Sequence, residues 1–172
     1  MKKLYLSLFL CLAVLPARAE FNDGVVAYLM GQYDKAYSTM RSLAESSEHA
    51  YAQYYVGMMH MKGQGVEQDY KEAGEWFRRA SEQRVPQAQY KLGMLYMNGQ
   101  GLPKDYEFAY SWFRVGAVHG HKKSISALPE AREMLTEEEM KEAEKLSLEF
   151  IQKYGPKKED KESGKPMEIP NE

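Results

Sequence analysis

Cysteine is almost absent from this sequence of 172 residues, whose one cysteine, Cys11, lies in an apolar stretch near the N-terminus. An intramolecular disulfide needs two cysteines and a thiolate zinc site needs several, so neither holds this fold together. If the N-terminal stretch is removed, the mature chain also has no thiol nucleophile. Packing and hydrogen bonds must therefore stabilise the protein.

The sequence also lacks a charge excess of either sign and a long hydrophobic run. Its 23 Lys and Arg residues face 25 Asp and Glu residues, and no basic block provides the positive footprint that nucleic-acid binding requires. The apolar run at residues 4–15 is shorter than the about 20 residues of a membrane span. We therefore expect no nucleic-acid partner and no membrane span in the mature chain.

The N-terminal stretch has the features of a secretory signal peptide. Lys2 and Lys3 precede the apolar run, Pro16 ends it, and Ala17-Arg18-Ala19 forms an A-x-A cleavage site. These features predict a signal peptide at residues 1–19 that is cleaved after Ala19. The mature protein is then expected to be periplasmic or secreted.

Common catalytic motifs are missing as well. The sequence has no Ser-x-x-Lys, Gly-x-Ser-x-Gly or His-Glu-x-x-His, and its Gly-Gln-Gly turns do not continue into the Gly-Lys-Ser/Thr of a phosphate loop. We expect no enzyme activity and no cofactor. Two alternatives stay open: a hydrolase acting on cell-wall or β-lactam-like substrates, and a periplasmic metal binder that uses methionine and histidine.

Two short segments raise the metal alternative. Met58-Met59-His60-Met61 offers soft ligands for Cu(I), and His119-Gly120-His121 has the spacing of a chelating pair. On a helix the first four side chains point in different directions, which favours core packing. The histidine pair lies near a helix C-terminus, where histidine is favourable against the helix dipole. We therefore assign no metal site.

What the sequence does contain is a 36-residue segment that occurs twice, at residues 50–85 and 86–121. A fixed period of this length predicts stacked supersecondary units. The residues shared at equivalent positions include Ala52/Ala88, Gly57/Gly93, Gly63/Gly99, Gly65/Gly101, Asp69/Asp105, Ala73/Ala109, Trp76/Trp112 and Phe77/Phe113.

Each copy reads as a pair of helices. Apolar residues at helical spacing predict a first helix that ends at Gly63 or Gly99, where glycine can adopt the left-handed cap conformation. Asp69 and Asp105 then have the character of N-caps. The second helices are expected over residues 70–84 and 106–119, with a buried stripe made by Ala73, Trp76, Phe77 and Ala80 in one copy and by Ala109, Trp112, Phe113 and Gly116 in the other.

The flanking regions complete the predicted domain. Residues 23–49 read as a degenerate repeat, and residues 122–154 as capping helices, the last opened by a Thr136–Glu139 capping box. The charged tail at residues 155–172 has few large apolar groups and is expected to be disordered. The folded domain therefore covers residues 20–154.

The string A-Q-Y-x-x-G, continued by G-Q-G and D-Y-x-x-A-x-x-W-F, resembles the Sel1-like repeat family, which is related to tetratricopeptide repeats. This resemblance implies an all-α fold: an α/α superhelical solenoid of helix pairs with a C-terminal capping helix. It also implies a protein–protein interaction adaptor that binds a peptide or protein in its concave groove. Bacterial relatives act in envelope assembly, secretion, signalling and host contact. We expect a monomer.

Positions that differ between the two copies are the candidates for specific binding, because packing already explains the shared ones. The resemblance implies that the first helix of each pair lines the concave surface, and one stripe of each helix would then form the groove. A tyrosine- and methionine-bearing surface suits recognition, although an ordinary solvated face is the alternative. The predicted groove residues are Tyr51, Tyr55, Met58 and Lys62 in the first copy and Gln87, Lys91, Met94 and Asn98 in the second.

Overall fold

The computed structural model describes residues 19–46 and 49–157, and these residues form helices and connecting turns with no β-strand among them. Most of the predicted signal peptide and residues 158–172 of the predicted tail lie outside the described residues. A helix at residues 19–29, called the N-terminal helix below, precedes seven more: α2 (Tyr33–Ser46), α3 (Ala50–Lys62), α4 (Tyr70–Glu82), α5 (Pro86–Asn98), α6 (Tyr106–Val118), α7 (Lys122–Glu133) and α8 (Glu137–Tyr154).

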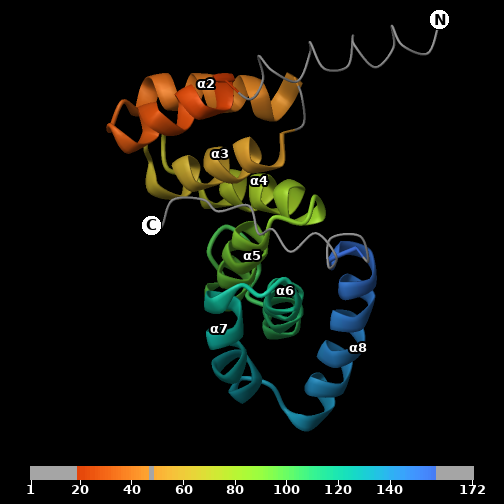
Figure 1. The fold of residues 1–172 in the computed structure, drawn as a ribbon. Coiled ribbons are helices and arrows are strands. Elements are labelled where there is room, and N and C mark those ends of the chain that lie inside the picture. Colours follow the sequence, from red (N-terminus) through yellow and green to blue (C-terminus); the bar gives the residue numbers. More distant parts are fainter. Residues whose placement is uncertain (1–18, 47–48, 158–172) are drawn as a thin grey trace, which may run out of the picture.

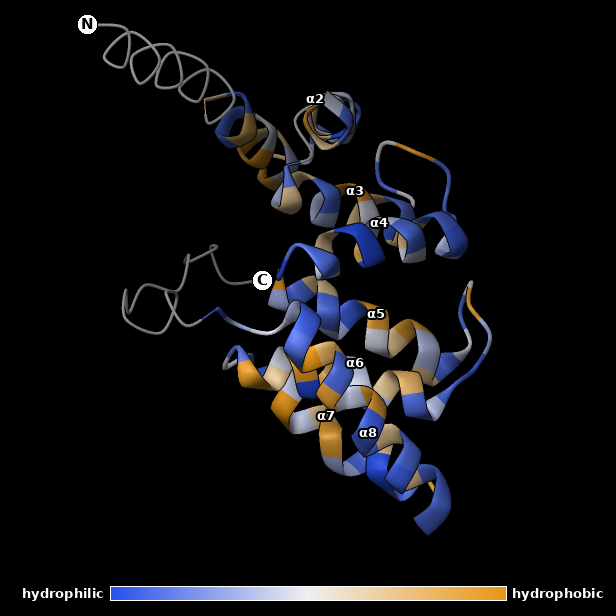
Figure 2. Ribbon diagram, turned by 90° about the vertical axis from the view of Figure 1, so that its right-hand side faces the viewer, coloured by the Kyte–Doolittle hydropathy of each residue, from blue (hydrophilic) through white to orange (hydrophobic). Residues whose placement is uncertain are grey.

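The helices stack as successive antiparallel pairs, which confirms the predicted all-α solenoid. Each helix from α2 to α6 packs against the next one in the chain, and α8 returns to pack against α6. In Figure 1 the pairs descend from the N-terminal helix and α2 at the top, and α6 lies between α7 and α8 at the bottom. Helix α8 turns a largely hydrophilic face outward in Figure 2, as expected of a helix that covers the end of a core.

Helix ends follow the rules that the repeat predicts. Gly63 and Gly99 cap α3 and α5 in the left-handed conformation, with φ of 66° and 67°. Asp69 accepts hydrogen bonds from the backbone N–H groups of Lys71 and Glu72, and Asp105 accepts one from Phe108. The predicted caps are therefore confirmed in both copies.

The second helices end earlier than predicted. Helix α4 ends at Glu82 rather than residue 84, and α6 ends at Val118 rather than residue 119. The cause is a left-handed residue at the same place in each turn: Arg84 has φ of 66° and Gly120 has φ of 79°. Sequence periodicity carries no signal for a non-glycine residue in this conformation.

The second glycine of each Gly-Gln-Gly turn has a packing role. Gly65 lies directly against the backbone of Tyr33, and Gly101 lies in the same way against the backbone of Tyr70. A Cβ atom at either glycine would overlap these backbone atoms, so only glycine lets the turn dock on the start of the preceding pair's second helix. The turns therefore set the stacking of one pair on the next.

The core lies between the two helices of each pair and between neighbouring pairs. Each of the two equivalent phenylalanines, Phe77 and Phe113, fills the space beside a helical glycine, Gly57 or Gly93. The predicted stripes on α4 and α6 are buried throughout, which confirms the assignment of the shared residues to packing. Among the described residues, no helix combines the length and the hydropathy that a membrane span needs.

Candidate protein-binding surface

Helix α5 presents the predicted binding residues of the second repeat. It buries Gln89, Leu92, Gly93 and Leu95 on the faces that meet α4 and α6. Because residues three and four apart share a helix face, a stripe spaced by four, three and four positions escapes this burial. The stripe consists of Gln87, Lys91 and Met94, which are half-buried, and Asn98, which is exposed.

The equivalent stripe on α3 is largely covered. The exposed fractions of Tyr55 and Met58 are 7% and 1%, and both belong to the main core. Two rings of the N-terminal helix lie edge-on against Tyr55: Phe21 at 6.0 Å and Tyr28 at 5.3 Å between ring centroids. In the described conformation Tyr55 and Met58 therefore do not form the open surface that the sequence predicts for them.

The two ends of the α3 stripe stay accessible. Tyr51 is half-buried, and burial raises the pKa of its hydroxyl. Lys62 is exposed, and its Nζ donates to the Tyr28 hydroxyl at 3.3 Å. The structure thus keeps six of the eight predicted residues at least partly exposed: Tyr51 and Lys62 at the two ends of α3, and four residues on α5. We call these four the α5 surface: Gln87, Lys91, Met94 and Asn98.

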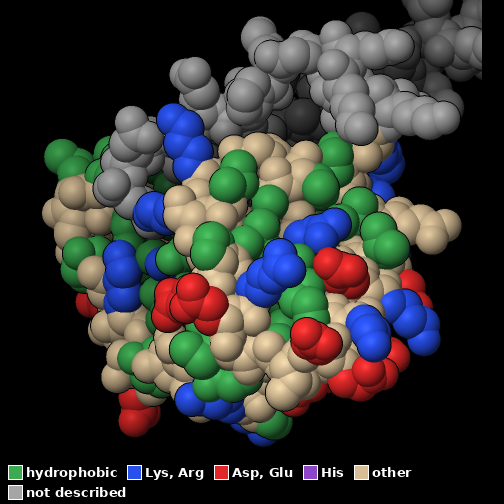
Figure 3. Space-filling model, turned by 90° about the horizontal axis from the view of Figure 1, so that it is seen from below, with side chains coloured by type: hydrophobic (Ala, Val, Ile, Leu, Met, Phe, Trp, Pro, Cys, Tyr) green, Lys and Arg blue, Asp and Glu red, His purple; other side chains and the backbone are tan. Residues whose placement is uncertain are grey.

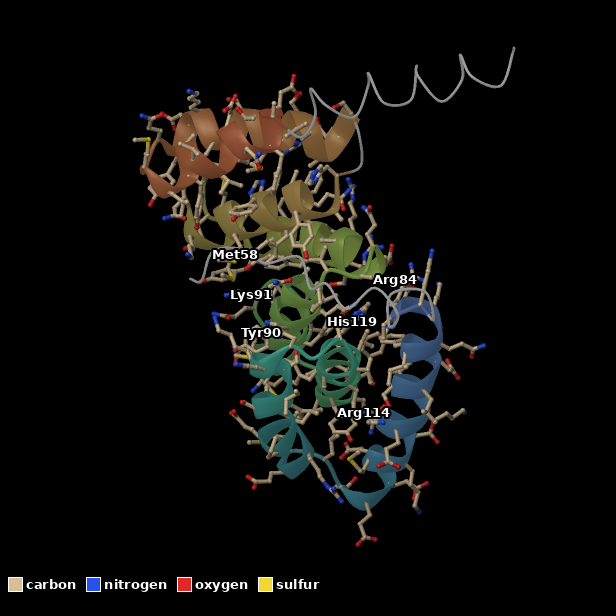
Figure 4. The ribbon with its side chains drawn as sticks, in the orientation of Figure 1. Met58, Arg84, Tyr90, Lys91, Arg114 and His119 are labelled. Atoms are coloured by element: carbon tan, nitrogen blue, oxygen red, sulfur yellow. The ribbon has the colours of Figure 1, made fainter. Side chains whose placement is uncertain are left out.

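Tyr90 is a residue of this region that the repeat comparison missed. It is half-buried, with its ring 5.8 Å from Phe113 and 5.5 Å from His121. In Figure 4 Tyr90 and Lys91 lie on the side of α5 that is turned away from α8. Tyrosine occupies the equivalent position in the other copy, Tyr54, so the sequence marks it as a packing residue and gives no signal of its partial exposure.

A second set of polar side chains binds the end of α8 on the opposite side of the molecule (Figure 4). Arg84 donates from Nε to the Gly155 carbonyl oxygen at 3.0 Å and from Nη2 to that of Lys153 at 3.1 Å. His119 Nε2 lies 3.0 Å from the Tyr154 carbonyl oxygen. These bonds satisfy carbonyl groups that every helix leaves unpaired at its C-terminus. The sequence signal for this contact is an arginine at the position that is Gly120 in the other copy.

The histidines and methionines have structural roles. Met58 and Met59 are buried in separate core clusters, and His60 Nε2 lies 3.1 Å from the Tyr37 hydroxyl. His119 contacts the end of α8, as above. Within residues 19–46 and 49–157 no group of three or more His, Cys, Asp or Glu side chains could hold a metal ion. The geometry of these residues therefore gives the metal alternative no support.

One contact has the composition of a nucleophile and its base. His121 Nδ1 lies 2.9 Å from the Ser124 hydroxyl oxygen and 3.2 Å from the Ser124 backbone nitrogen. Ser124 is completely buried, so its hydroxyl cannot reach a substrate. This geometry is an N-cap of α7, in which the ring nitrogen accepts the backbone N–H. The contact therefore gives no support to the hydrolase alternative.

The end of the molecule formed by α7 and α8 carries mixed charges. Seen from below in Figure 3, basic and acidic side chains alternate between small apolar patches. Nearby lysine and glutamate side chains pair along α8, with Lys141 Nζ 3.0 Å from Glu138 Oε2. A face of this kind lacks the concentrated positive charge that binds nucleic acid.

These features define an α/α repeat scaffold: stacked helix pairs whose shared apolar residues pack in the core and whose second repeat leaves one stripe of α5 at least partly exposed. The family profile of the Sel1 repeat matches residues 50–85 and 86–121, so the protein carries two Sel1 repeats. Sel1 repeats commonly form protein-interaction scaffolds, and proteins built from them are generally non-catalytic.

Solved structures share this fold. The chain is similar to a protective antigen present in uropathogenic Escherichia coli strains, which has an SLR fold, with a TM-score of 0.78 and 28% identity over 91% of this chain and 34% of that one. It is also similar to a Sel1 repeat protein from Oxalobacter formigenes, with a TM-score of 0.57 and 30% identity over 62% of this chain and 43% of that one. The chain thus spans less than half of each. No curated protein matches the sequence.

Proposed function

We propose that the protein is an exported interaction scaffold that binds an extended segment of a partner protein along the α5 surface. The observation that carries this proposal is the exposure of one stripe of α5. Shared residues such as Trp112 and Phe113 are buried, whereas Gln87, Lys91 and Met94 stay partly exposed, and the first two of these differ in type from their counterparts on α3. A repeat protein offers such a surface to partners rather than to a reaction.

The side chains of the α5 surface can contact both the main chain and the side chains of a bound peptide segment. The Gln87 Oε1 atom is buried and has no hydrogen-bond partner among the described residues, so rotation of the amide would present an acceptor to a partner's N–H group. Met94 supplies a flexible apolar contact, and Lys91 supplies a positive charge. Together these groups favour an extended segment that carries an acidic and an apolar side chain.

Export is the second part of the proposal. Its support is the basic, apolar and A-x-A sequence of residues 1–19. The test is fractionation of a bacterium that expresses the full-length chain, followed by N-terminal sequencing of the mature protein. A chain beginning at Glu20 in the periplasm or medium is expected. A full-length chain retained in the cytoplasm would refute export.

Site-specific photocrosslinking tests the binding surface. A photoreactive amino acid at Gln87 or Asn98 should crosslink a partner in an envelope extract, whereas the same group at Lys71 or Glu142, which are exposed on α4 and α8, should not. Lys91→Glu and Met94→Asp should each weaken the crosslink at Asn98 at least tenfold. Tyr55→Ala is unsuitable, because Tyr55 is a core residue and its loss would destabilise the fold.

Helical circular dichroism and thermal unfolding of each variant provide the control for folding. If Lys91→Glu and Met94→Asp fold normally and leave every crosslinked partner unchanged, the α5 surface is not the binding site. Equal crosslinking from Lys71 would point instead to nonspecific association.

A further inference from the structure

Aromatic rings take part in the contact that joins the N-terminal helix and α2 to α3, and two of these rings are histidines. The Phe21 ring stacks on His49 with centroids 4.4 Å apart, and the Tyr37 ring lies edge-on to His60 at 5.5 Å. The N-terminal helix also covers Tyr55, as described above. Two imidazoles therefore lie within the contact between these helices and α3, and the same contact hides the middle of the α3 stripe.

His49 acts on α3 as a neutral ring. It is the N-cap residue, and its Nδ1 accepts the backbone N–H of Ala52 at 3.3 Å. An acceptor nitrogen needs a free lone pair, so this bond requires an unprotonated Nδ1. The groups that meet the ring are the Phe21 ring from the N-terminal helix and the Ala52 N–H from α3. Protonation removes the cap bond and places a cation at a helix N-terminus, where the dipole disfavours it.

The cap position recurs with the period of the repeat. The residues that precede α3, α5 and α7 are His49, Val85 and His121, each 36 positions from the next. His121 caps α7 through Nδ1 as His49 caps α3. Val85 makes no side-chain cap, and Pro86 after it has no N–H to satisfy. His121 therefore makes the same kind of N-cap as His49 at the other end of the solenoid, and it can serve as a matched control.

His60 is the second neutral ring, and it is almost wholly buried. Its Nε2 bonds the Tyr37 hydroxyl, while Nδ1 is buried without a hydrogen-bond partner among the described residues. A protonated ring would bury a second N–H group with no acceptor, which is costly. Burial lowers the pKa of His60 most strongly; Glu72 and Asp69 raise it and Arg41 lowers it further.

Burial also lowers the pKa of His49, against a smaller opposing effect of a hydrogen bond at its own backbone. An imidazolium stacked on Phe21 gains some cation–π attraction, but it loses the cap bond. For both rings the folded-state pKa is below the ordinary value of about 6.5, so a locally open state takes up protons first as the pH falls. Acid therefore favours opening, and neutral pH favours the closed contact.

We propose that the N-terminal helix and α2 form a pH-sensitive cover over α3, which loosens when His49 and His60 take up protons and then exposes Tyr55. This inference rests on the proposed function in one respect: the uncovered α3 stripe would extend the α5 surface. The loosening itself is a property of the unliganded protein.

Hydrogen exchange with mass spectrometry tests the cover at pH 7.5 and pH 5.0, with intrinsic exchange rates corrected. Protection of residues 19–46 should fall by about tenfold for each unit by which a histidine pKa is depressed, while α4 to α6 keep theirs. The double variant His49→Asn and His60→Gln replaces both rings with non-titrating side chains. In His49→Asn the amide Oδ1 can accept the cap bond that His49 Nδ1 accepts, and in His60→Gln the amide can bond the Tyr37 hydroxyl. It should lose the selective pH response, whereas the matched control His121→Asn should retain it.

Two outcomes would overturn the proposal: a uniform loss of protection along the chain in acid, or a pH response that persists in the double variant. If the double variant fails to fold, NMR titration of the imidazole Cε1 protons in the unsubstituted protein decides the matter, because a pKa of 6.5 or above for both His49 and His60 contradicts it. Neither measurement needs a partner, so failure of crosslinking at α5 leaves this test intact, and the reverse also holds.

Discussion

The two Sel1 repeats place the same tryptophan at the same position, but the two indoles have different covers. Trp76 on α4 contacts two guanidinium groups, with Arg41 Cζ 5.1 Å and Arg79 Cζ 4.6 Å from the ring centroid. Trp112 on α6 lies under α8, with ring centroids of Phe150 and Tyr154 at 4.9 and 5.4 Å. Both tryptophans are buried, so the repeat determines the packing position and the neighbouring element determines what covers it.

Two polar residues at equivalent positions in the two repeats differ in the same way. In the first repeat Gln83 donates from Nε2 to Gln53 Oε1 at 2.8 Å, so the two amides bond to each other. Their equivalents in the second repeat, His119 and Gln89, both contact the carbonyl oxygen of Tyr154, at 3.0 and 3.4 Å. These two residues therefore bond to each other in the first repeat, whereas in the second repeat they bind the end of the C-terminal helix.

Truncation of the two tryptophans should give the largest losses of stability. It should also distinguish a tryptophan that only fills the core from one that also holds α8. Trp76→Ala and Trp112→Ala should each lower the free energy of unfolding by about 3–5 kcal/mol, because each leaves a large cavity. Only Trp112→Ala should also speed hydrogen exchange in α8, since Phe150 and Tyr154 lose their packing surface. Urea unfolding followed by circular dichroism measures the first quantity. If both variants speed hydrogen exchange in α8 equally, Trp112 has no special role in holding that helix.

Shared packing positions should instead respond alike. A Cβ atom at Gly57 would lie 2.7 Å from the Phe77 ring, and one at Gly93 would lie 2.5 Å from the Phe113 ring. Gly57→Ala and Gly93→Ala should each cost about 1–3 kcal/mol of stability through overpacking. Gly74→Ala is the control, because the nearest atoms to its Cβ are 3.3 Å away on the flexible Leu102 side chain. Thermal unfolding should show losses at the first two positions and little change at the third.

The fold and its helix caps could be predicted because each depends on short-range sequence patterns, and these patterns occur in both repeats. Glycine turns at Gly63 and Gly99, aspartate caps and the Trp-Phe stripes all follow from local spacing, and the structure confirms them. The same locality explains why the stripes on α4 and α6 were assigned correctly to the core.

The covered part of the candidate surface could not be predicted, because it depends on a contact between segments with little sequence similarity. The N-terminal helix belongs to the degenerate repeat, and its ring contacts with Tyr55 are set by the angle at which that pair docks. Arg84 was missed for a different reason. Helical periodicity extends through residue 84, and the sequence signal of a left-handed residue there is the glycine at the equivalent position, Gly120.

Substitutions in the turns after α4 and α6 test the contact with the end of α8, and we expect them to change stability less than the changes above. Arg84→Ala should lower stability, because it removes two hydrogen bonds to α8 and keeps the left-handed backbone. Arg84→Gly should be more stable than Arg84→Ala by about 1–2 kcal/mol, because glycine tolerates this conformation. Gly120→Ala measures the same conformational cost alone, since a Cβ there meets nothing within 4 Å. If Arg84→Ala leaves α8 exchange unchanged, the arginine does not hold that helix.

The aspartate caps should give the smallest difference between the repeats. Asp69 Oδ1 accepts from Lys71 N at 2.8 Å and Glu72 N at 3.0 Å, whereas Asp105 Oδ1 accepts from Phe108 N at 2.9 Å. Asp69→Ala and Asp105→Ala should each lower the free energy of unfolding by about 1 kcal/mol. The loss should be larger for Asp69→Ala by about a few tenths of a kcal/mol, because that variant loses two accepted hydrogen bonds rather than one. The Asp→Asn variants keep a cap oxygen and serve as controls. A larger loss at Asp105 in thermal unfolding would show that packing around the cap, rather than the number of accepted bonds, decides its contribution.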